Sequence, residues 1–114
     1  MSRNRSRLLS SPPFAVENAL RTLGANLRTA RLRRNISVGE MSEKLGVNPK
    51  SVLDAEKGKA STSIGIYVAL LWALDLLDQF YELANPEKDT EGRNLAALRD
   101  RSHAYRPQRI DNDF

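Results

Sequence analysis

The sequence predicts an all-α protein, and three observations point to this fold class. Apolar residues recur every three or four positions from about Phe14 to Arg34, which places them on one face of a helix. Two helix starts and two glycine stops follow within Ser37–Gly58. A further apolar segment, Ile64–Leu83, continues at helical spacing.

Length and composition indicate a single ordinary domain. The chain has 114 residues, of which 40% are hydrophobic and 28% are charged, and this is enough for one core. It contains no cysteine, so disulfides and thiolate metal sites are excluded, and a reducing compartment such as the cytoplasm is expected. No apolar run approaches the roughly 18 residues of a membrane span. We also expect no secretory segment.

Charge is distributed unevenly along the chain. Residues 1–34 contain eight arginines and one acid, Glu17, whereas the remaining eighty residues contain ten basic and thirteen acidic side chains. A basic front part suggests a polyanionic partner, and an acidic back part suggests solvent or a different partner. Residues 1–12 lack helical periodicity, and we expect them to form a flexible basic arm.

The first long helix is predicted over residues 14–34. Gly24 interrupts its pattern, at a cost of about 1 kcal/mol relative to alanine. Its last two turns are rich in arginine, and cations there complement the helix dipole. The residues that share its apolar face are Leu20, Leu23, Leu27 and Ala30.

Residues 37–58 have the pattern of two short helices joined by a tight turn. Ser37 begins a capping box, and Gly46 supplies the left-handed residue that ends such a helix. Asn48 is a favourable N-cap, and Pro49 follows it at the first helical position. Helices of this length with so short a turn form a helix-turn-helix, although an ordinary helical hairpin has the same signature.

The second of these helices has an inward and an outward face, because successive side chains are rotated by about 100°. Val52 and Ala55 point inward with Glu56 beside them, and a semi-buried acid needs a cation. The outward side chains would meet base edges if the helix lay in a major groove. These base-reading candidates are Pro49, Lys50, Ser51, Leu53 and Asp54.

Three of the candidates have a defined chemistry toward bases. Lys50 would donate to guanine O6 or N7, Leu53 would contact a thymine methyl group, and Asp54 would accept from cytosine N4. The alternative is that Lys50 and Asp54 pair with each other at i,i+4 on a solvated helix face.

Several residues together resemble the XRE family, the helix-turn-helix domains of Cro-type phage repressors. They are an arginine late in the first helix, Leu-Gly-Val at residues 45–47 and Glu-Lys-Gly at residues 56–58. The resemblance covers about Leu23–Leu76. It implies a five-helix lambda-repressor-like domain that binds double-stranded DNA as a transcriptional repressor.

The same resemblance implies a structural salt bridge between Arg31 and Glu56, and a loop after the third helix that runs along DNA phosphates. The chain departs from the family pattern at three positions. Pro49 and Asp54 occupy places that usually carry polar or basic side chains, and Val38 replaces a polar phosphate-contacting residue. The phosphate-contact candidates are Arg28, Ser37, Lys57, Lys59, Ser61 and Thr62.

The helix predicted from Ile64 to Leu74 is apolar on two faces. The opposite stripe carries almost no charge before Asp75, and a helix that is apolar all round must be covered on both sides. The stripe that is buried in the family corresponds here to Ile64, Tyr67, Leu71 and Leu74.

We expect the second stripe, continued into a short fifth helix that ends at Asn85, to form a homodimer interface. The alternative is that the first helix covers this stripe within one chain, through Phe14, Val16 and Leu20. The interface candidates are Val68, Trp72, Leu76 and Phe80.

Residues 13–85 are thus expected to form the DNA-binding and dimerisation domain, and residues 86–114 a polar tail that is partly disordered or docks on a partner. Leu95 and Leu98 give this tail one weakly amphipathic turn. His103 is the only histidine and has no neighbouring nucleophile or ligand set. No enzyme activity, metal site or cofactor is therefore expected.

Two flanking runs, residues 10–34 and 68–92, resemble small bacterial regulators of the HipB type, which are typically encoded beside HipA-like kinase toxins. This resemblance implies a cytoplasmic, nucleoid-associated antitoxin that represses its own operon as a dimer and holds the toxin in a complex. The alternative class of function is a protein-interaction module that keeps the repressor fold with weak or lost DNA binding.

Overall fold

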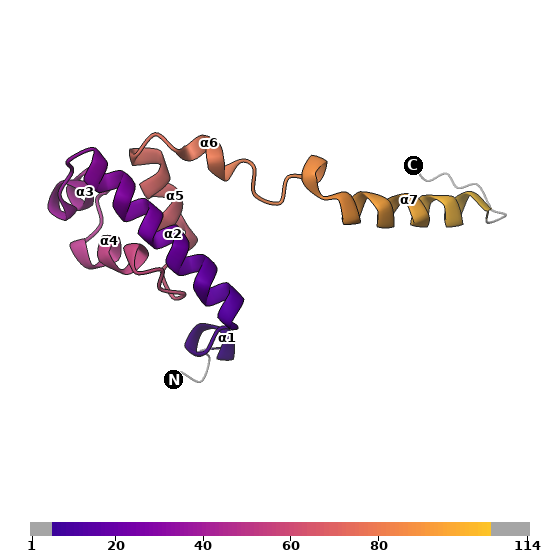
Figure 1. Ribbon diagram of the computed structural model, residues 1–114, viewed down its shortest axis with the longest axis horizontal. Coiled ribbons are helices and arrows are strands. Elements are labelled where there is room, and N and C mark those ends of the chain that lie inside the picture. The colour runs from indigo at the N-terminus through magenta and orange to yellow at the C-terminus, as the bar shows by residue number, and fades with distance from the viewer. Residues whose placement is uncertain (1–5, 106–114) are drawn as a thin grey trace. The chain divides into compact units, whose positions relative to one another are not determined.

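The computed structural model describes residues 6–105, which form helices and no β-strand. The all-α prediction is therefore confirmed. The chain divides into two units, Met1–Phe80 and Tyr81–Phe114. The first unit contains α1 (Arg7–Ser10), α2 (Phe14–Arg33), α3 (Val38–Leu45), α4 (Pro49–Glu56), α5 (Ile64–Ala73) and α6 (Leu77–Phe80) (Figure 1).

The five helices expected from the sequence correspond to α2 through α6, and α1 is an addition to them. Ser6 caps α1, which makes one helical turn in the arm that was expected to lack secondary structure. The arginines at positions 3 and 5 lie outside the described residues.

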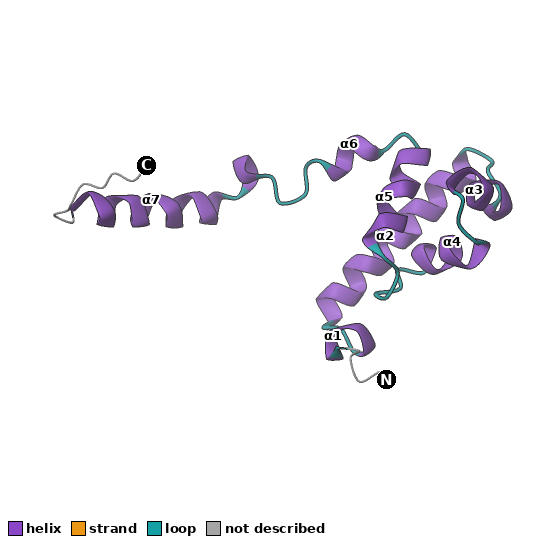
Figure 2. Ribbon diagram, turned by 180° about the vertical axis from the view of Figure 1, so that it is seen from behind, coloured by secondary structure: helices purple, strands orange, loops and turns teal. Residues whose placement is uncertain are grey.

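Side-chain caps define where α3, α4 and α5 begin. Ser37 Oγ accepts from the Glu40 N–H at 3.0 Å, and the Glu40 carboxylate accepts from the Ser37 N–H at 2.8 Å. Asn48 caps α4 and Ser63 caps α5 by accepting backbone N–H groups of their first turns. Gly46 ends α3 with a φ of 70°. Short loops therefore join these three helices (Figure 2).

One hydrophobic core joins four helices of the first unit, and α4 packs against α2, α3 and α5. Burial of each large apolar side chain in such a core stabilises the fold by about 1.5–3 kcal/mol. The core consists of Leu27 and Ala30 from α2, Met41 from α3, Val52 and Ala55 from α4, and Tyr67, Leu70, Leu71 and Leu74 from α5 and its end.

The crossing of α2 and α4 is a contact between backbones. A Cβ atom added to Gly24 in α2 would lie 2.6 Å from the carbonyl oxygens of Ala55 and Glu56. Gly58, just after α4, has a φ of 72°, and a Cβ atom added to it would overlap the backbone of Leu20 and Arg21. The glycine that interrupts the helical pattern of α2 is therefore the residue that allows α4 to approach it.

The buried face of α5 differs from the expected stripe at two positions. Ile64 is 67% exposed, whereas Leu70, which was not part of the expected stripe, is buried at the centre of the core. Ser63 caps the helix immediately before Ile64, so Ile64 is the first residue of α5. Tyr67, Leu71 and Leu74 are buried.

The structure does not support the alternative in which the first helix covers the second stripe of α5. Phe14 is 74% exposed and Val16 is 40% exposed, and Trp72 on the stripe is itself 56% exposed. Leu20 packs against the edge of the core. The end of the apolar segment is also shorter than expected, because α6 stops at Phe80 rather than near Asn85.

The second unit contains η2 (Pro86–Lys88), a 3-10 helix, and α7 (Thr90–Tyr105). The sequence indicated one amphipathic turn here, whereas α7 is 16 residues long. Asp89 Oδ1 accepts from the Gly92 N–H at 2.9 Å and stabilises the start of α7. Leu95 and Leu98 are both more than half exposed. Among residues 6–105, no helix combines the length and the apolar character needed to cross a bilayer.

Candidate nucleic-acid interface

The outward face of α4 presents the side chains expected to meet bases. Pro49, Lys50 and Leu53 are exposed, and Ser51 and Asp54 are half-buried. We refer to these five residues as the reading face. Because Val52 and Ala55 on the opposite side are fully buried, α4 cannot rotate without disrupting the core.

A buried ion pair fixes the inner side of α4. Arg31 Nε and Nη2 donate to the two carboxylate oxygens of Glu56, at 2.6 and 2.9 Å. Arg31 Nη1 donates to the Ile36 carbonyl oxygen at 2.8 Å. The hydrogen bonds that Arg31 donates to the Glu56 carboxylate raise the pKa of Arg31. The structure thus brings together the two residues expected to pair, and their bidentate geometry joins α2, α4 and the link to α3.

Lys50 and Asp54 on the reading face are paired with each other. Lys50 Nζ lies 2.9 Å from Asp54 Oδ2, and Lys59 Nζ lies 3.7 Å from the same oxygen. The hydrogen bond from Lys50, with the nearby charges of Lys59 and Lys57, lowers the pKa of Asp54. The i,i+4 pair of Lys50 and Asp54, which was the alternative to base contact, is therefore present. The Asp54 carboxylate is thus already paired with cations in the protein without DNA.

The loop after α4 is held by backbone hydrogen bonds on the α4 side and by a side-chain hydrogen bond on the α5 side. The Asp54 carbonyl oxygen accepts from the Lys57 and Lys59 N–H groups, at 3.2 and 3.1 Å. The Tyr67 hydroxyl donates to the Lys59 carbonyl oxygen at 3.0 Å, and burial raises the pKa of Tyr67. The position of Lys59 is consequently determined by α4 and α5 together.

The phosphate-contact candidates differ in how accessible they are. Arg28, Ser37, Lys57, Lys59 and Ser61 are exposed, although Ser37 Oγ already serves as the cap of α3. Thr62 is not available, because its hydroxyl oxygen is buried and its N–H donates to the Lys59 carbonyl oxygen at 3.1 Å. A threonine hydroxyl is a suitable donor to phosphate, but the turn from Lys59 to Thr62 buries the hydroxyl of Thr62.

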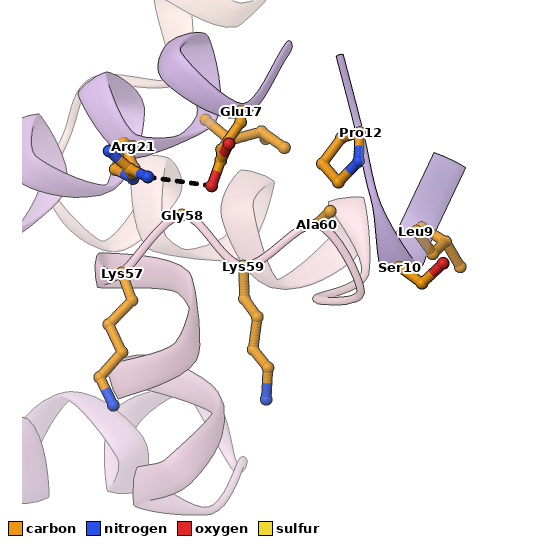
Figure 3. A pocket seen from close by; sticks show the side chains of 10 residues that line it. Leu9, Ser10, Pro12, Glu17, Arg21, Lys57, Gly58, Lys59 and Ala60 are labelled. Carbon is orange, nitrogen blue, oxygen red and sulfur yellow. Dashed lines mark hydrogen bonds and ion pairs between the residues drawn. The ribbon is translucent and has the colours of Figure 1, made fainter. Parts of the chain in front are cut away.

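A pocket of about 260 Å³ lies where α1 and α2 approach the loop after α4. Leu9, Ser10 and Pro12 line one side of it, and Lys57 to Ala60 line the other. Figure 3 shows Gly58 facing Arg21 and Glu17, which form an ion pair of 2.9 Å, while Lys57 and Lys59 extend together away from that pair. The two lysines therefore share one side of the loop.

The four interface candidates do not form a uniformly exposed stripe. Trp72 is 56% exposed, and Lys44 Nζ lies 5.7 Å from the centre of its ring. Val68 is half-buried, and Leu76 and Phe80 pack partly against the core. Trp72 is thus the most exposed of the four, with Val68 beside it one helical turn earlier.

Sequence reasoning missed the roles of Gly58, Tyr67 and Lys44. Gly58 was assigned only as a helix stop, and its contact with α2 requires knowing where α2 passes. Tyr67 was assigned to the core by the resemblance to the family, but nothing in that resemblance indicated the bond from its hydroxyl to the loop. Lys44 lies one residue before Leu45 and carries no pattern that links it to Trp72.

Among residues 6–105, no group of three or more histidine, cysteine, aspartate or glutamate side chains is arranged to hold a metal ion. Comparison of the chain with protein-family models, with curated proteins and with solved structures found no match.

Proposed function

We propose that this chain is a sequence-specific DNA-binding transcriptional repressor with a lambda-repressor-like helix-turn-helix domain. In this proposal α3 and α4 are the two helices of the motif, and α4 enters the major groove of double-stranded DNA. Lys57, Lys59 and Ser61 contact phosphates from the loop that follows.

The observation that carries the proposal is the difference between the two sides of α4. Its inner side is fixed by the core and by the Arg31–Glu56 pair, while its outer side is exposed at Pro49, Lys50 and Leu53 and contributes no residue to the core. A short, rigidly held helix with an accessible polar face and lysines beside it is what groove readout requires.

Binding as a homodimer is part of the proposal. The exposed Trp72 and its neighbour Val68 provide an apolar patch on α5, and aromatic side chains are frequent at the centres of interfaces. Two copies would present two reading faces to half-sites about 34 Å apart. Trp72→Arg should therefore shift the protein from dimer to monomer in sedimentation; an unaltered dimer would rule out this interface.

Gel retardation of DNA at several salt concentrations tests the main proposal. The purified protein should retard a duplex taken from upstream of its own gene, and the affinity should fall by orders of magnitude between low and moderate salt. Lys50→Ala should relax the preference among sequences more than it weakens binding. No retardation even at low salt would disprove the proposal.

The proposal extends to an antitoxin, cytoplasmic in bacteria, that represses its own operon and binds a HipA-like kinase toxin. This part rests on the resemblance of residues 10–34 and 68–92 to HipB-type regulators. A neighbouring gene that encodes a kinase-like toxin, and co-purification of the two products, are the expected results. Failure of the two proteins to associate would refute the toxin partner without affecting DNA binding.

A second function is favoured by one observation. Asp54 neutralises part of the positive charge on the reading face by its contacts with Lys50 and Lys59. A protein-interaction module that kept the repressor fold with weak or lost DNA binding would have such a face. The salt titration separates the two functions, because only the repressor shows a steep salt dependence.

A further inference from the structure

Asp54 lies between two lysines that approach it from opposite directions along the chain. Lys50 reaches it from the start of α4 and Lys59 from the loop after α4, and both ammonium groups meet the same oxygen, Oδ2. A single carboxylate therefore holds two of the cations nearest to the reading face.

The carboxylate is the fixed member of this cluster. The Asp54 side chain is only 20% exposed, whereas Lys50 is 72% exposed and Lys59 is 50% exposed. The Asp54 backbone is also anchored, because its carbonyl oxygen accepts from the Lys57 and Lys59 N–H groups. A change in pairing thus requires the lysine side chains to move, since the acid cannot follow them.

DNA phosphates compete with Asp54 for the same lysines. When a lysine moves to a phosphate it leaves the carboxylate, which then faces a polyanion without its cation, and like charges brought together oppose binding. This cost is independent of base sequence, so it weakens binding to every DNA.

A suitable base removes the cost. The amino groups of cytosine N4 and adenine N6 project into the major groove and donate to a carboxylate, whereas guanine and thymine present acceptors there. We infer that Asp54 is a specificity-determining residue: it withholds Lys50 and Lys59 from the phosphates of arbitrary DNA and releases them where a cytosine or adenine amino group faces its carboxylate. This inference rests on the proposed DNA binding.

The inference is tested with Asp54→Asn and a short random-sequence duplex as probe. The matched control is Asp75→Asn, which makes the same change of charge at the far end of α5, where the φ of 64° suits asparagine. Asp54→Asn should bind the random duplex roughly three- to tenfold more tightly at low salt, and its salt slope should steepen by about one to two. Asp75→Asn should behave like the wild type.

A second pair of variants asks whether Asp54 acts through the lysines. In a chain carrying Lys50→Met and Lys59→Met, Asp54→Asn should no longer increase affinity for the random duplex by the same factor. Asp54→Ser repeats the measurement with a side chain that lacks the amide donor. Circular dichroism on each variant establishes that the helices are retained.

The outcomes distinguish this inference from the proposed function. If the wild type binds DNA and Asp54→Asn matches Asp75→Asn on the random duplex, the role of Asp54 is overturned and DNA binding stands. If neither the wild type nor Asp54→Asn binds the duplex at low salt, both the role of Asp54 and the proposed DNA binding are overturned. If only Asp54→Asn binds the duplex, Asp54 does withhold the two lysines from DNA, and the wild-type chain is not a DNA-binding repressor.

Discussion

The inner and outer faces of α4 each carry an acid paired with a base, and the two pairs differ in what they do. Glu56 and Arg31 are buried, bidentate and bonded to the backbone as well. Asp54 and Lys50 lie at the surface, where solvent screens their attraction. A carboxylate paired with a cation therefore fixes the fold on one side of the helix and leaves a surface free to exchange partners on the other.

The largest expected effect comes from breaking the inner pair. Arg31→Met should lower the free energy of unfolding by about 3–5 kcal/mol, because Glu56 would remain buried without its cation. Urea denaturation measures this loss. The double variant Arg31→Met, Glu56→Met should recover much of it, since no buried charge is left. A single variant that loses less than the double variant would contradict the account of the inner face.

The contact between the backbones of α2 and α4 should be nearly as sensitive. Gly24→Ala should cost about 2–3 kcal/mol, because the new methyl group meets carbonyl oxygens that cannot rotate away. Gly39→Ala is the matched control within α3, where the nearest heavy atom, Ser37 Oγ, is 3.8 Å from the added Cβ. It should leave stability unchanged or raise it by about 0.5–1 kcal/mol. Equal melting temperatures of the two variants would show that α2 and α4 are less closely packed.

Neighbouring residues on α4 provide the next contrast. Val52→Ala should cost about 2 kcal/mol, since it removes two methyl groups from a fully buried site. Leu53→Ala, one position along on the reading face, should change stability by less than about 0.5 kcal/mol. Thermal melts of both variants test whether the two faces differ as described, and a larger loss from Leu53→Ala would reverse the assignment of the faces.

The smallest effect on stability is expected from Lys50→Ala. The side chain is exposed and its bond to Asp54 is screened, so the melting temperature should not change measurably. Its effect should appear in DNA binding instead, as relaxed sequence preference. If Lys50→Ala lowers the melting temperature as much as Arg31→Met does, the reading face has a structural role that the contacts do not indicate.

Much of the fold could be predicted because its signals are local. Ser37, Asn48 and Ser63 mark helix starts through bonds within one turn, and such bonds depend on adjacent sequence alone. The burial of Leu70 and the exposure of Ile64 depend on where α3 and α4 cover α5. The periodicity of apolar residues carries no information about this packing. For the same reason the sequence indicated that Gly24 destabilises its helix, but it did not indicate that Gly24 allows α4 to approach α2.

The residues of the candidate site could be predicted, but the sequence did not decide between the alternative partners of Lys50. Rotation along α4 identified the outward residues, whereas the choice between Lys50 contacting DNA and Lys50 contacting Asp54 depends on side-chain positions. The second lysine on Asp54 comes from the loop, and Tyr67 on another helix fixes that loop. No spacing rule links Tyr67 to Lys59, because the hydrogen bond between them joins a helix and a loop that are brought together only by folding.

The glycine crossing of α2 and α4 also has a consequence for how this protein can change. Gly24 and Gly58 set the separation of the two helices by backbone contact, so nothing that positions α4 lies among its outward side chains. The side chains at residues 49, 50, 53 and 54 can therefore be replaced without disturbing the core, provided that proline and glycine are excluded from the helix interior. A library restricted in this way should keep the same folded helix arrangement, and new recognition preferences are open to it without redesign of the core.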